Sequence, residues 1–174
     1  YKRHFNSKAS QLVLDKFGVD IKIPSHISKV KTDSNFFWIS NMSVDVRQDI
    51  VIYTYPFVDT KTFTKEYLLN KRDSILKKHI PGPTANSYMQ TEYKLEPVFK
   101  GINKNNKYCA EIRAWWRVEG DLMGGPFISH TQLDERTQNI ITIEGFVYAP
   151  GISKRLYMRQ LESVIYNIQF PTNN

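Results

Sequence analysis

Residues 108–118 read YCAEIRAWWRV, and this stretch decides the fold class because apolar side chains recur at every second position. Side chains of a β-strand point alternately to opposite faces, so this alternation predicts a strand with one buried and one polar face. The predicted buried face holds Tyr108, Ala110, Ile112, Ala114, Trp116 and Val118. The predicted polar face holds Cys109, Glu111, Arg113, Trp115, Arg117 and Glu119.

Short turns connect this strand to its neighbours in the sequence. Further strands are predicted at 87–93, 97–102, 127–133 and 140–148, with turns at 103–107 and 134–139. Strands joined by such short turns pair antiparallel, because a parallel return needs about a dozen residues or more. Earlier strands are predicted at 19–24, 36–40 and 49–57, and the last of these is expected to be covered on both faces.

Helical spacing of apolar residues predicts three helices, at 7–17, 60–80 and 153–169. Gly18 ends the first helix and the segment 81–83 (PGP) ends the second. The basic residues of the second helix are predicted to flank or oppose its apolar stripe; they are Lys65, Lys71, Arg72, Lys77 and Lys78. We therefore expect one α+β domain over 1–174, a mostly antiparallel sheet flanked by an N-terminal, a central and a C-terminal amphipathic helix. Residues 1–6 are expected to be disordered and residues 171–174 to form a tail.

The composition narrows the function classes. Among 174 residues, 24 Lys and Arg face 17 Asp and Glu, and the formal net charge of +7 favours anionic partners. No run of like charges forms a basic tail, so nucleic-acid binding ranks last among the partners considered. A single cysteine excludes a disulfide framework, and no apolar run approaches the roughly 20 residues of a membrane span. Because the chain begins at Tyr1, we expect an upstream segment that would carry any targeting signal.

The sequence predicts no metal site and no cofactor. His4, His26, His79 and His130 share no metal-ligand spacing, and glycine motifs for phosphates or dinucleotides are absent from the sequence. Cys109 is interpreted as a passive thiol.

Three short segments are candidate sites, each with a structural alternative. In the hairpin 119–126 (EGDLMGGP), Glu119 and Asp121 can form a carboxylate pair for acid–base work or cation binding. The alternative is a long turn that uses its glycines for geometry, with Met123 packed over an edge of the core.

The second segment begins the last helix, where Ser153 is the predicted N-cap and Lys154, Arg155 and Arg159 follow. Exposed cations there oppose the helix dipole by about 0.3–1 kcal/mol each. Either an internal ion pair with Glu162 or a bound external anion would offset that cost.

The third segment is the polar face of the 108–118 strand. Arg113, Trp115 and Arg117 alternate along it and can form a stacking platform for sugar rings or bases. They can equally lie beneath a helix.

Several stretches resemble one protein family. The most specific are MGGPF within RAWWRVEGDLMGGPFIS (113–129) and KRLYMRQLE within KRLYMRQLES (154–163). EGFVYAPG (144–151), NFFWIS (35–40), NKRDSILKKHIPGP (70–83) and SYMQTEY (87–93) also fit. Over residues 18–170 the chain resembles the C-terminal half of lipoproteins of the Bacteroidetes cell envelope, catalogued as domain of unknown function 4837. The resemblance implies an exported, lipid-anchored protein and assigns no catalytic residue.

The predicted order of elements is also similar to the PsbP-like α/β/α sandwich, a fold with many accessory or binding modules. Together these features predict a non-enzymatic binding or accessory domain of an exported, lipid-anchored envelope protein, periplasmic or associated with the outer membrane. Its expected partners are an anionic glycan, lipid or envelope protein, with membrane contact only through an upstream anchor. The alternative is a hydrolase acting on envelope glycan or lipid, with Asp121 and Glu119 as acid–base residues beside Arg113.

Overall fold

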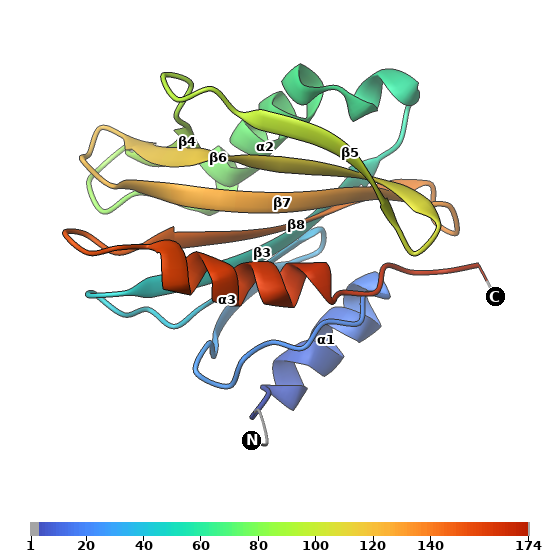
Figure 1. Cartoon of the computed structure of the whole chain (residues 1–174), viewed down its shortest axis with the longest axis horizontal. Coiled ribbons are helices and arrows are strands. Elements are labelled where there is room, and N and C mark those ends of the chain that lie inside the picture. Colours follow the sequence, from blue (N-terminus) through green and yellow to red (C-terminus); the bar gives the residue numbers. More distant parts are fainter. Residues whose placement is uncertain (1–3, 174) are drawn as a thin grey trace.

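An eight-stranded antiparallel sheet and three α-helices make up residues 4–173, the part of the chain that the computed structural model describes (Figure 1). This arrangement confirms the predicted α+β class. The strand order is β1-β2-β3-β8-β7-β6-β4, and β5 pairs with β6 alongside β4. The strands are β1 Lys29–Asp33, β2 Phe36–Ser40, β3 Arg47–Pro56, β4 Tyr88–Thr91, β5 Val98–Lys104, β6 Lys107–Glu119, β7 Gly124–Asp134 and β8 Asn139–Tyr148.

Helices cover both faces of the sheet. In Figure 1, α3 (Arg155–Tyr166) lies in front of the strands with α1 (Ser7–Phe17) below it, and α2 (Lys65–His79) lies behind them. Two hydrophobic clusters follow this division. One joins α1 and α3 to the near face, and the other joins α2 to the far face. Because β3 lies between both clusters, its residues 48–53 are buried on both sides, as predicted.

Strand β6 shows the predicted alternation. Its even-numbered residues from Ala110 to Val118 are buried in the α2 cluster, while Tyr108 at the start of the strand is half exposed. The opposite face is not wholly polar, because Cys109 is buried in the α1–α3 cluster. Burial raises the pKa of the Cys109 thiol to about 11, so it stays protonated at neutral pH.

The predicted strand at 19–24 is wrong. Val19, Ile21 and Ile23 are fully buried, as their alternation suggests, but the segment makes only isolated bridges outside the sheet, at Asp20 and Pro24. Conversely, β1 was not predicted, because all five of its residues are exposed and carry no apolar pattern. It pairs with β2 at the edge of the sheet.

Helix starts differ from the predictions. The segment 60–80 divides into a 3₁₀-helix, Thr60–Phe63, and α2, because the Thr64 side chain accepts a hydrogen bond from the Tyr67 N–H and begins a new helix. In α3, Lys154 rather than Ser153 is the N-cap and its side chain makes no capping bond.

The N-terminal segment is partly defined in the structure. Asn6, inside the segment predicted to be disordered, accepts a hydrogen bond from the Ala9 N–H at 3.0 Å and so caps α1. Phe5 pairs with Pro24 in an isolated bridge. The predicted disorder therefore does not extend to these two residues, and 1–3 lie outside the described residues.

Arg72 is the largest departure from the predicted helix faces, because its side chain is buried between α2 and the sheet. Its Nε and Nη2 atoms each donate to the Glu144 carboxylate of β8 at 2.7 Å. Nη1 donates to Thr91 at 3.0 Å, and the guanidinium carbon lies 3.9 Å from the centre of the Phe127 ring. The charge is thus tied to three strands, and this bidentate ion pair sets where α2 lies on the sheet.

We expect Arg72→Met to lower the free energy of unfolding by about 3–5 kcal/mol, because it leaves the buried Glu144 carboxylate without its partner. The double variant Arg72→Met/Glu144→Leu should recover a large part of that loss, since no buried charge remains. Urea unfolding monitored by circular dichroism measures both. Lys78→Met on the exposed side of α2 is the matched control and should change stability by less than about 0.5 kcal/mol. A single variant as stable as this control would contradict the prediction.

Candidate functional site

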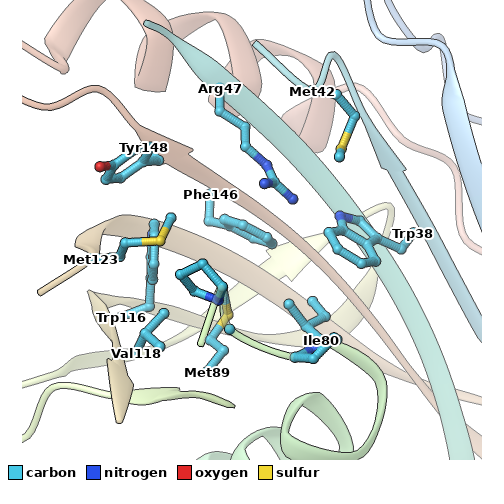
Figure 2. Close-up of a pocket in the computed structure, with 13 residues that line it drawn as sticks. Trp38, Met42, Arg47, Ile80, Met89, Trp116, Val118, Met123, Phe146 and Tyr148 are labelled. Carbon is cyan, nitrogen blue, oxygen red and sulfur yellow. The ribbon is translucent and has the colours of Figure 1, made fainter. Parts of the chain in front are cut away.

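A pocket of about 230 Å³ opens on the α2 side of the sheet, just past the end of that helix (Figure 2). Helix α2 ends at His79, and the turn through Pro81, Gly82 and Pro83 leads the chain away to β4. The sheet beyond this point has no helix over it, so its side chains form the floor of the pocket. The lining comprises Trp38, Met42, Arg47, Ile80, Pro81, Gly82, Pro83, Met89, Trp116, Val118, Met123, Phe146 and Tyr148.

Aromatic and sulfur-containing side chains dominate the lining. The Trp116 ring meets Phe146 edge to face, with ring centres 5.6 Å apart, and its indole N–H donates to the Val147 carbonyl at 3.2 Å. Because this N–H is satisfied, the indole presents an apolar surface to the pocket. Met42 and Met123 come from the loops before β3 and β7, and flexible thioethers there can adapt to a bound group.

Asp49 holds two of the lining residues in place. Its carboxylate is fully buried, accepts a hydrogen bond from the Trp38 indole at 2.8 Å, and lies 3.1 Å from Nε of Arg47. The guanidinium also lies over the Trp38 ring, 5.4 Å from its centre. Burial raises the pKa of Asp49, and the Arg47 charge and the hydrogen bonds oppose that rise. Asp49 therefore orients Trp38 and Arg47 as one unit.

Arg47 is the single charged side chain among the described residues that line the pocket. Figure 2 shows its guanidinium directed into the space between Phe146 and Trp38. Only Nε contacts Asp49, and Nη1 and Nη2 make no hydrogen bond to any of residues 4–173. These terminal nitrogens are available to a ligand.

Sequence reasoning did not find this pocket. Trp116 was interpreted only as a core residue, and Arg47 and Met42 lie in a segment without a recognisable motif. The available signal was the helix stop at 81–83, which marks where α2 leaves the sheet.

The two carboxylates of the predicted pair, Glu119 and Asp121, contact different groups. Glu119 pairs with Arg117 at 2.6 Å and accepts from the Gln90 amide at 3.0 Å. Asp121 accepts from the N–H of the next residue, Leu122, at 2.6 Å and so supports the hairpin turn. Met123, expected at an edge of the core, packs against the α2 cluster at the pocket rim.

The basic residues of α3 are not paired with Glu162, which instead pairs with Arg113 of β6. The Lys154 ammonium donates to the Ile152 carbonyl at 3.3 Å. Arg155 and Arg159 are exposed and form no ion pair with residues 4–173. Because Arg155, Arg159 and Glu162 are spaced four and three residues apart, they share the side of α3 that faces β6.

The Arg113–Trp115–Arg117 row is covered at one end and open at the other. Arg113 lies beside α3 and donates to Glu111 at 3.1 Å. Trp115 is 42% exposed, and Arg117 pairs with Glu119 and lies 3.8 Å from Glu92. In Figure 1 no helix lies in front of this part of β6. The open end therefore faces the same side of the molecule as the α3 arginines.

A buried polar chain beneath the end of α3 was also missed. Lys104 donates to the Ile165 carbonyl at 2.6 Å and lies 3.0 Å from Nδ1 of His130. Nε2 of His130 lies 2.8 Å from Glu111, whose carboxylate also accepts from the Tyr166 hydroxyl. The sequence separates these residues by up to 62 positions, so no local pattern shows the cluster.

The protonation states of this chain follow from its burial. Burial and the nearby Lys104 charge lower the pKa of His130 to about 4, and burial lowers that of Lys104 to about 8. Burial alone would raise the pKa of Glu111, but hydrogen bonds from Tyr166, His130 and Arg113 bring it below its ordinary value. At neutral pH, neutral His130 therefore donates to the Glu111 carboxylate and accepts from the Lys104 ammonium. The chain anchors α3 to β5, β6 and β7.

The described residues contain no group of three or more His, Cys, Asp or Glu arranged to hold a metal ion. Within residues 4–173, none of the helices combines the length and apolar character that crossing a membrane requires.

Comparison with known families identifies one match. The family model described as "Domain of unknown function (DUF4837)" matches residues 6–167, which is most of the chain. No curated protein matches the sequence.

The pKa of His130 predicts an acid-sensitive fold. The unfolded chain takes up this proton near pH 6.5 and the folded chain only near pH 4, so protons favour unfolding between these values. We expect the free energy of unfolding to hold its full contribution from neutral His130 above pH 6.5 and to fall by about 3 kcal/mol as the pH reaches 4. His130→Gln should remove that part of the pH dependence, and His4→Gln, at an exposed position, should retain it. Urea unfolding at half-unit pH steps measures the difference, and parallel curves for wild type and His130→Gln would contradict the assignment.

Proposed function

Given that the chain belongs to the DUF4837 family, a domain whose function the family description leaves open, we propose that it is a binding domain that takes a small apolar group into the pocket beyond α2. One observation carries the proposal: twelve of the thirteen lining residues are uncharged and mostly apolar, aromatic or sulfur-containing. Concave apolar sites with few polar groups are typical of small-molecule binding sites. The partly exposed pocket keeps this apolar surface accessible from solvent.

The pocket volume limits the size of the bound group. About 230 Å³ lies below the roughly 300–1,000 Å³ of sites for drug-sized ligands. A single aromatic ring or a short acyl chain is therefore the expected occupant, while the remainder of a larger ligand would stay outside. Aromatic walls such as Trp38, Trp116 and Phe146 favour flat or flexible apolar groups through ring and CH contacts.

We prefer a binding function to the hydrolase alternative. Glu119 pairs with Arg117, and Asp121 supports the backbone of its own hairpin. These contacts give both carboxylates a structural role. Among residues 4–173, by contrast, no segment fills the open side of the pocket. We retain the exported, lipid-anchored setting in the cell envelope as a proposal that rests on the resemblance of segments 113–129 and 154–163.

Filling the pocket tests the proposal. We expect 1-octanol, an uncharged chain of suitable size, to bind with a dissociation constant of about 1 mM or tighter, from roughly 0.5 kcal/mol for each of its nine heavy atoms. Met123→Trp should weaken this binding at least tenfold, because the larger side chain occupies the rim. Quenching of tryptophan fluorescence and proton NMR line broadening of octanol measure it.

Leu122→Trp is the matched control, since Leu122 is the adjacent residue and is fully exposed outside the pocket lining. It should bind octanol like the wild type. Equal binding by the two tryptophan variants, or no saturable binding to the wild type, would overturn the proposed function.

A second candidate function concerns the open face of β6. The observation that favours it is the exposed Trp115 ring on the face of β6 that packs toward α3, the helix of Arg155 and Arg159, which form no ion pair with residues 4–173. Sugar rings stack on exposed indoles, and unpaired arginines attract acidic groups. This surface is the one that an anionic glycan, lipid or envelope protein would contact.

We expect the double variant Arg155→Ala/Arg159→Ala to elute earlier than wild type from a dextran sulfate column at low salt. Trp115→Ala should also elute earlier without any change in charge, if sugar rings stack on the indole. Lys8→Ala/Lys29→Ala removes two exposed charges elsewhere and is the control for net charge. Equal shifts for both double variants would assign retention to net charge alone and contradict this function.

A further inference from the structure

We propose that the ligand of the pocket is an apolar carboxylic acid, such as a short fatty acid or an arylalkanoic acid, whose carboxylate binds the terminal nitrogens of Arg47. This inference rests on the proposed function and adds the chemical class of the ligand. It follows from how Arg47 is held, how its nitrogens are shared, and where they lie relative to the apolar lining.

The Arg47 guanidinium is preorganised before any ligand arrives. Its Nε atom lies 3.2 and 3.1 Å from the two oxygens of Asp49, and Asp49 in turn is held by the Trp38 indole at 2.8 Å. Stacking over the Trp38 ring restricts the plane of the guanidinium. A ligand therefore meets an oriented donor group and does not have to order a flexible side chain.

Asp49 uses only one edge of the guanidinium. An arginine carries five N–H donors, and the contacts with Asp49 involve only the one on Nε. The four donors on Nη1 and Nη2 make no hydrogen bond to residues 4–173, although the side chain is only 21% exposed. A planar carboxylate matches two parallel N–H donors, which makes it the anion best suited to this edge.

The Arg47 and Asp49 charges balance, so an anion would be recognised by directed hydrogen bonds to Arg47. Asp49 already compensates the Arg47 charge, so the pair attracts anions at long range only weakly. An acid is then selected by short charge-assisted hydrogen bonds at the pocket and not by a broad positive field. The neighbouring Trp38 and Phe146 rings receive the apolar part of the same molecule, since Figure 2 shows the guanidinium directed between them.

Two probes of equal size separate the acid group from the apolar chain. We expect octanoate to bind the wild-type protein at pH 7.5 about tenfold more tightly than octanamide, which has the same chain and no charge. In Arg47→Gln the ratio should fall to about one, while octanamide affinity changes by less than threefold. Lys61→Gln, at an exposed position outside the pocket, should preserve the tenfold ratio.

Each outcome distinguishes the inference from the function on which it rests. Equal affinity of the wild type for octanoate and octanamide overturns the inference and leaves the pocket as an apolar site. Absence of binding by both probes overturns the proposed function as well. A preference for octanoate that persists in Arg47→Gln assigns the acid to another group and overturns the role of Arg47. The wild-type comparison decides the ligand class even where Arg47→Gln fails to fold.

Discussion

The Arg72–Glu144 ion pair is the constraint around which the far side of the molecule is arranged. Two charges removed from water are tolerated only when each meets the other in good geometry, and here both contacts are 2.7 Å. This requirement places α2 over β8 at one position along its length. Helix α2 ends at His79, and Trp116 and Phe146 beyond this end line the pocket, although little of either side chain is exposed.

Buried carboxylates recur as organising groups in this fold. Asp49 orients Arg47 and Trp38 at the pocket, while Glu111 joins His130 to the end of α3. Each carboxylate is compensated by a cation and by a hydrogen-bonded ring: Asp49 by Arg47 and Trp38, and Glu111 by Arg113 and His130. Such pairs remove one positive and one negative charge together, so the net charge of +7 stays on the groups outside them.

The strand at 108–118, both its neighbouring hairpins and the approximate helices were predictable because they depend on local periodicity. The alternation at 19–24 correctly indicated which side chains are buried, yet the segment packs outside the sheet, since burial alternation alone does not specify a hydrogen-bonding partner. For β1 the reverse holds: pairing with β2 makes it a strand although all its side chains are exposed. The pocket could not be predicted, because its lining comes from loops and strands spread between positions 38 and 148.

Hydrophobic patterning and turn residues alone account for an antiparallel sheet with amphipathic helices, because each of these features is set within a few neighbouring residues. Family membership also follows from the sequence, over residues 6–167. The faces to which Arg72, Glu111 and Asp49 turn depend instead on partners far along the chain. Long-range contacts decide which charges become buried, which part of the sheet lies beyond the end of α2 and which edge of the Arg47 guanidinium faces the pocket. Only the folded chain brings those atoms together.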